Sequence, residues 1–258
     1  MQNNNLFTKF MGVFTNDPSL FGATVDSESL AGRIRAKQLY MLQRYAPNLL
    51  LANLINTFLL ILSFAGTGNE TAVIAWSATL AVFVLYSFHC WRREFRNSSQ
   101  NYVPANAPRK AIAMAFLHGL IWAAFRLLFI GPHLNGSQLI ILAVTIGTMG
   151  AGAATFATIP GAVVVFVGPI VAGSIISLRI HDIAFAPHIS LLLALFAFVL
   201  AQAAFGQARL FASRIINEDE QRKKNDMIGM LLGEFEENAS DWLWETDSLG
   251  RIAYISTK

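Results

Sequence analysis

Cysteine and charged residues are both scarce in this chain of 258 residues. A single cysteine, Cys90, excludes a disulfide framework and any zinc site built from several cysteines. Only 14% of the residues are charged, whereas soluble domains average about 25%. Aromatic residues are plentiful, with 20 Phe and five Trp, which excludes a disordered chain. The composition therefore argues against an ordinary soluble enzyme.

The apolar residues gather in stretches that contain no Asp, Glu, Lys or Arg, which are 45–69, 71–91, 111–125, 127–178 and 183–208. A helix needs about 20 apolar residues to cross a bilayer, and a surface helix of a soluble protein needs a polar face. Turn signals at 131–136 and 158–161 divide the longest stretch. We therefore predict an all-α polytopic membrane protein with six transmembrane helices, at 46–66, 71–91, 111–131, 138–158, 161–179 and 188–210.

Basic residues predict the orientation of these helices. Seventeen of the 19 Lys and Arg precede the first helix, lie between the second and third, or follow the sixth. The three opposite loops hold only Arg179, and Arg126 lies within the third helix. Because basic loops stay in the cytoplasm, we expect both termini there and a lipid bilayer as the partner. The same distribution explains the net charge of +3, so we expect no nucleic-acid binding.

The first 45 residues contain no apolar segment of the length that a cleavable signal peptide requires. Residues 26–45 begin with a possible helix cap at 26–29 and then mix apolar with basic residues. They predict either an amphipathic helix along the inner headgroups or a helical extension of the first span. We assign 1–45 to a cytoplasmic N-terminal segment and 46–210 to the transmembrane domain.

Residues 211–238 are predicted to continue the sixth helix into the cytoplasm. Acidic and basic residues four positions apart support an exposed helix at 218–224. Ile228, Leu232 and Phe235 then follow at spacings of four and three, which is typical of a short coiled-coil seam. We predict a signalling helix that forms a homodimer; the alternative is a solvated helix that pairs with nothing.

The final segment, 239–258, contains two strand-like runs at 241–247 and 251–256. The turn between them ends in Gly250, where a left-handed residue is needed. An isolated hairpin is marginally stable in water, and two tryptophans in three residues need a surface to pack on. We expect this segment to be the opening of a domain whose remainder is missing.

Two parts of the sequence resemble known signalling modules. Residues 236–256, through Asp241, Trp242, Trp244, Asp247 and Gly250, resemble the first two strands of a PAS domain and their turn. More loosely, the residues 118–122, 150–154, 168–169 and 178–179 resemble a bacterial six-helix sensory module. In that family the module precedes PAS domains, which are followed by GGDEF diguanylate cyclase, EAL phosphodiesterase or histidine kinase domains. The resemblance implies an input module in a bacterial inner membrane for cyclic-di-GMP or phosphorelay signalling.

The chain departs from that family by lacking its catalytic signatures. It contains no Gly-Gly-Asp-Glu-Phe or Glu-Ala-Leu sequence, no kinase ATP site and no P-loop. We therefore expect no enzymatic activity, no cofactor and no metal in this chain. A small six-helix transporter or channel is the alternative, although no acidic residue lies within a predicted span.

Candidate ligand or signal residues lie on one face of the third helix. His118, Trp122 and Arg126 are spaced by four residues and therefore share that face. Arg126 is the one charged residue within a predicted span, which makes it a candidate functional residue. Its distance of roughly 7–8 Å from the helix end also allows it to snorkel to the surface.

The outer loops supply a second group of candidates, which are His133, His181, Asp182 and His188. If those loops meet, imidazoles and a carboxylate could bind a transition metal or respond to pH. Their spacing matches no compact metal motif, so unrelated loop histidines are the alternative. Small residues in the fourth and fifth helices, including Gly150 and Gly173, predict close helix approach.

Overall fold

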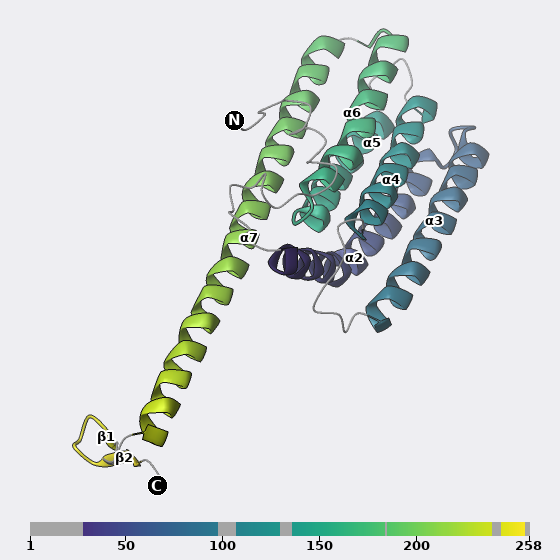
Figure 1. Ribbon diagram of the computed structural model, residues 1–258. Helices are drawn as coiled ribbons and strands as arrows, with labels where there is room; N and C mark the ends of the chain where they lie inside the picture. The colour runs from purple at the N-terminus through teal and green to yellow at the C-terminus, as the bar shows by residue number, and fades with distance from the viewer. Residues whose placement is uncertain (1–27, 98–106, 130–135, 184, 239–243, 256–258) are drawn as a thin grey trace. The chain divides into compact units, whose positions relative to one another are not determined.

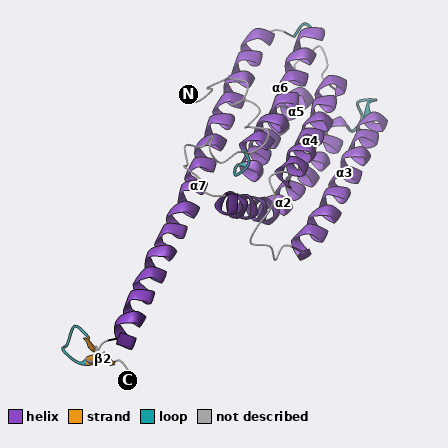
Figure 2. Cartoon of the chain, viewed as in Figure 1, coloured by secondary structure: helices purple, strands orange, loops and turns teal. Residues whose placement is uncertain are grey.

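The structure is a computed structural model that describes residues 28–97, 107–129, 136–183, 185–238 and 244–255 (Figure 1). These residues form long helices and one two-stranded sheet (Figure 2). The helices are α2 (Glu28–Phe64), α3 (Glu70–Asn97), α4 (Ala107–Phe129), α5 (Gly136–Phe156), α6 (Pro160–Ile180) and α7 (Ala186–Asn238). Each contains a stretch long and apolar enough to cross a membrane, so the prediction of six such helices is confirmed.

The chain divides into two compact units, residues 1–212 and 213–258. In the first unit, α4 packs most extensively against α6, while α2 packs mainly against α3 and α5. The contacts between α4 and α6 follow the same order along both helices. They pair Gly119 with Phe166, Ala123 with Gly173, and Arg126 with Ser174. The two helices are therefore parallel neighbours that are separated in the sequence by α5.

Helix α2 joins the N-terminal segment to the first predicted span without a break in its helical assignment. Pro47 lies inside it, and a proline inside a helix removes one backbone hydrogen bond and bends the helix. Figure 1 shows the first part of α2, in dark purple, lying across the direction of α3 and α4. Residues 28–45 are thus helical and continuous with the first span but run in a different direction, which agrees with both predicted alternatives.

The first part of α2 is attached to the connection between α5 and α6. Gln38 Nε2 donates a hydrogen bond of 2.8 Å to the backbone carbonyl of Thr158. The Thr158 hydroxyl in turn donates to the Gln38 carbonyl at 3.4 Å. Two reciprocal bonds between segments 120 residues apart place both segments at the same end of the helices.

The second unit contains the end of α7 and a β-hairpin. Along α7, Lys223 and Asp219 form an ion pair of 3.1 Å at the predicted i,i+4 spacing. Strands β1 (Trp244–Thr246) and β2 (Ile252–Ile255) pair antiparallel, with Trp244 opposite Ile255. The predicted strands are therefore present in the described residues, whereas Asp241 and Trp242 lie outside them.

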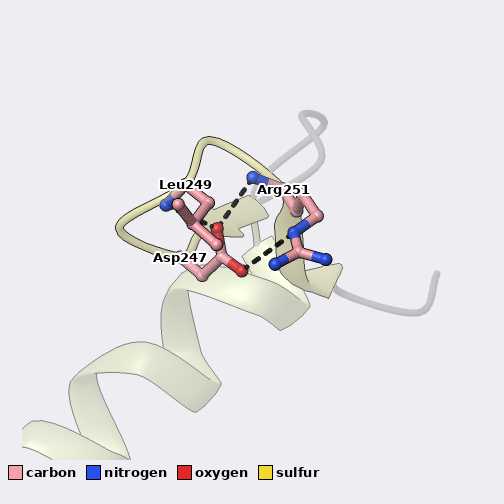
Figure 3. A network of polar contacts seen from close by, with 3 residues as sticks. All are labelled: Asp247, Leu249 and Arg251. Carbon is pink, nitrogen blue, oxygen red and sulfur yellow. Dashed lines mark hydrogen bonds and ion pairs between the residues drawn. The ribbon is translucent and has the colours of Figure 1, made fainter.

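The hairpin turn is organised by one carboxylate. Asp247 Oδ1 accepts hydrogen bonds from the backbone N–H groups of Leu249 (2.8 Å) and Arg251 (2.9 Å), as Figure 3 shows. The second oxygen, Oδ2, lies 3.4 Å from Arg251 Nε. Gly250 has φ +76°, the left-handed conformation expected of it, and it donates its N–H to the Asp247 carbonyl.

Candidate functional site

The face of α4 that carries His118, Trp122 and Arg126 is buried in the first unit, and none of the three side chains is more than 4% exposed. Glycines allow this burial, because Gly119 places its backbone directly against the Phe166 carbonyl of α6. A Cβ built on Gly173 would lie 3.0 Å from the Ala123 Cβ. The predicted polar face of α4 is therefore held tightly between neighbouring helices.

Asn53 of α2 lies at the centre of the buried polar contacts, and this residue is only 2% exposed. Its Oδ1 lies 3.0 Å from His118 Nε2 and 3.0 Å from Trp122 Nε1. Its Nδ2 donates to the Leu49 carbonyl at 2.7 Å. One amide thus joins α2 to two positions of α4 and uses both of its polar atoms.

The contacts of Asn53 determine which ring nitrogen of His118 carries a hydrogen. An indole N–H can only donate, so Asn53 Oδ1 is an acceptor and the imidazole Nε2 must donate to it as well. The imidazole ring also lies between two phenyl rings, with centroids 5.3 Å from Phe83 and 5.1 Å from Phe166. His118 is consequently fixed in position by α2, α3 and α6 together.

Aromatic side chains surround this polar contact. The Trp76 ring lies 5.1 Å from Trp122 and 4.5 Å from Phe125, measured between centroids. Trp76 Nε1 donates to the Ile121 carbonyl at 3.1 Å, which connects α3 to α4. The first pair is edge-to-face and the second is tilted, and aromatic pairs of this kind contribute about 0.5–1.5 kcal/mol each beyond their buried area.

Arg126 lies two turns beyond His118 along α4. Its Nε donates to Ser174 Oγ of α6 at 3.0 Å, and the Ser174 hydroxyl donates to the Ile170 carbonyl at 2.7 Å. The guanidinium is therefore directed into the contact with α6 and does not extend toward the surface. Among the residues that the structure describes, Ser174 is its one hydrogen-bond partner.

Among the described residues, the other predicted candidates make no hydrogen bond or ring contact with this cluster. His133 lies outside the described residues. His188 is exposed and its ring contacts Phe185, while Asp182 is exposed with φ 45° and His181 caps the end of α6. Within the described ranges, no three His, Cys, Asp or Glu side chains come close enough to hold a metal ion.

The relay residues and the PAS-like residues belong to the second unit. Ile228, Leu232 and Phe235 are all exposed on α7, as are the neighbouring Met227 and Met230. Trp244 is also exposed, and Asp247 and Gly250 form the hairpin turn described above. The predicted dimer is not tested by a single chain.

Sequence reasoning missed the partners of the α4 face, above all Asn53 and Ser174. A second amide, Asn56, donates to Thr148 Oγ1 at 2.9 Å and connects α2 to α5. The available signal was the presence of two amides three residues apart in a stretch without charges. A search for charged residues alone does not detect them, because an amide satisfies its hydrogen bonds without carrying a charge.

The buried cluster contains an imidazole, an amide, indoles, hydroxyls and a guanidinium, with neither a carboxylate nor a thiol among the contacts named above. Such groups can bind and position a ligand by hydrogen bonding. They do not form a nucleophile and base pair of the kind that acyl transfer needs. No family model, curated protein or solved structure matches the chain.

Proposed function

We propose that this chain is the membrane-embedded sensory input module of a bacterial signal-transduction protein. The observation that carries the proposal is α7, whose helical assignment continues from Ala186 to Asn238. Its first half is apolar enough to span a membrane, and almost every residue from 220 to 235 is exposed. A helix of this kind joins a membrane domain to a domain in water.

Insertion of the first unit in a membrane is supported by its apolar outer surfaces. Leu54, Phe58 and Leu62 form a stripe along α2 at i, i+4 and i+8, and each is more than half exposed. On α7, Leu191, Leu195 and Phe198 are exposed to a similar degree. Apolar surfaces of this size in water are unfavourable, so lipid is the solvent that suits them.

The proposed orientation places both termini in the cytoplasm of the bacterial cell. The distribution of Lys and Arg supports it, because 17 of the 19 precede the first span, lie between the second and third spans or follow the sixth. The bonds between Gln38 and Thr158 agree with this arrangement, since they hold two predicted cytoplasmic segments together.

In the proposed mechanism, a signal changes the packing of α4 against α6 and α2, and α7 carries the change to the cytoplasm. Residues 213–238 extend roughly 39 Å at 1.5 Å per residue. Two conformations that differ by a few kcal/mol are sufficient for such a relay. The output belongs to a PAS domain and a diguanylate cyclase, phosphodiesterase or histidine kinase domain that this chain does not contain.

A homodimer through α7 predicts disulfide cross-linking at the seam. In a Cys90→Ser background, Leu232→Cys and Phe235→Cys are expected to form disulfide-linked dimers in membranes treated with an oxidant, because seam positions face each other across a coiled coil. Met230→Cys is the matched control, since Met230 is exposed but lies on the opposite side of the helix. Equal cross-linking at positions 230 and 232 would contradict the paired seam.

The relay itself is tested with a diguanylate cyclase domain joined after Asn238. His118→Ala disturbs the buried cluster and is expected to change cyclic-di-GMP production several-fold when α7 is unbroken. Gln221→Pro breaks the helix and is expected to abolish that difference, whereas Gln221→Ala preserves it. The proposal fails if His118→Ala changes production equally in the proline variant.

The alternative, a small six-helix transporter or channel, makes a different prediction. Purified protein in liposomes would then dissipate an imposed ion gradient at a rate that depends on the buried polar residues. We expect no such flux, because the sequence places no acidic residue inside the apolar stretches that would coordinate a cation.

A further inference from the structure

We infer that Arg126, Ser174 and Ser177 form a binding site for the carboxylate group of a small or amphipathic molecule, and the inference deepens the proposed function by naming a class of signal. Arg126 is a buried cation at 2% exposure, and its Nε bonds to a neutral hydroxyl. A buried charge is costly without a partner of opposite sign. The molecule itself therefore needs an anion at this position.

The sequence supplies no carboxylate for this purpose along α4 or along α6, the helix that packs most extensively against it. No Asp or Glu occurs between Glu94 and Asp182, a range that includes all of α4, α5 and α6. Ion pairs among the described residues also leave Arg126 without an acidic partner. A structural arginine in a span ordinarily pairs with an acid or with backbone carbonyls; because α4 and α6 offer no acid, a bound carboxylate would supply the matching negative charge.

A second polar group points to the same place. The Ser177 hydroxyl is completely buried and has no hydrogen-bond partner among the described residues. Because α4 and α6 are parallel and Ala123 meets Gly173, one further turn places Ser177 level with Arg126. Buried hydroxyls are nearly always hydrogen-bonded, so a donor without a described partner at the level of the guanidinium fits an oxyanion.

The surroundings indicate where such an anion would come from. Arg126 lies three residues before the end of α4, at a depth near one boundary of the span. Ile180, three residues after Ser177 and on the same face of α6, is 68% exposed and apolar. A carboxylate at this depth with an apolar surface beside it suits a fatty-acid-like molecule, and a free small acid offers the same group without the chain.

The experiment measures thermal unfolding of the full chain in an uncharged detergent, with laurate, dodecanol or acetate added. Laurate is expected to raise the unfolding temperature, while dodecanol, which has the same chain without the charge, leaves it unchanged. Stabilisation by acetate as strong as that by laurate would assign the site to small free acids. The inference is overturned if neither acid stabilises the protein more than dodecanol does.

Substitutions at Arg126 and Ser177 test whether laurate binds at these residues. Arg126→Gln is expected to weaken laurate binding by about tenfold to a hundredfold, because a charge-assisted hydrogen bond is lost. Arg126→Lys keeps the charge without the planar fork, and Ser177→Ala removes the second donor, so each is expected to weaken binding by a smaller factor. Ser87→Ala, which removes another buried unpaired hydroxyl on α3, serves as the matched control.

Two outcomes separate this inference from the proposed function. Unchanged laurate binding in Arg126→Gln, Arg126→Lys and Ser177→Ala overturns the site and leaves the α7 relay standing. Charge-dependent binding together with a negative relay experiment supports the site and rejects the sensory role.

Discussion

Replacement of Asn53 by leucine is expected to lower the free energy of unfolding of the first unit by about 2 kcal/mol or more. The substitution leaves two buried donors, His118 Nε2 and Trp122 Nε1, without the acceptor that both of them use. Each stranded donor costs about 1–3 kcal/mol in proteins, with smaller values in bilayers. The change is measured by tryptophan fluorescence during thermal or denaturant unfolding in detergent.

The control for this prediction is the neighbouring amide. Asn56→Leu removes one hydrogen bond to Thr148, whose hydroxyl can turn to a carbonyl of its own helix, so a smaller loss is expected. A double-mutant cycle adds a second check, because Trp122→Phe removes one of the donors that Asn53→Leu strands. The two substitutions together should cost less than the sum of their separate effects, and additivity would contradict the shared acceptor.

Alanine at two glycines is expected to change stability in opposite directions. Gly119→Ala directs a methyl group into the Phe166 backbone carbonyl, and because backbone cannot rotate away, α4 and α6 must separate. We expect a loss of about 2 kcal/mol or more, the range found for overpacked cores. The yield of folded protein and its unfolding temperature report the effect.

In the same experiment, Gly150→Ala is expected to raise the unfolding temperature. Nothing lies within 4 Å of a Cβ at Gly150, so the alanine enters open space on α5. Alanine stabilises a helix interior over glycine by about 1 kcal/mol. Destabilisation of the same size at both positions would show that the contact between Gly119 and Phe166 does not hold these helices together.

The six apolar helices could be predicted because charge-free stretches and helix breakers are local features of the sequence. The common face of His118, Trp122 and Arg126 could be predicted for the same reason, since helical periodicity fixes it. The partners of that face could not, because they depend on which helices are neighbours. Asn53 is 65 residues from His118, and Ser174 is 48 residues from Arg126.

The start of α2 shows the same division between local and distant causes. The prediction left open whether residues 26–45 lie along the membrane surface or extend the first span. Helix α2 has one continuous assignment from Glu28, and its first part is attached by Gln38 to the distant residue Thr158. Local composition could not predict the contact with Thr158, and that contact is compatible with both alternatives.

If the six helices insert in a membrane as proposed, the parallel packing of α4 against α6 also has a consequence for biosynthesis. Consecutive spans that follow each other through a translocon are antiparallel, and they can pair as soon as the second one enters the bilayer. Two parallel spans cannot do so, because a third must cross between them. The most extensive helix contact of the first unit therefore has to wait until Ile180 has left the ribosome and entered the membrane. Until then, the face of α4 that carries Arg126 and His118 is exposed to lipid, to the translocon or to a chaperone.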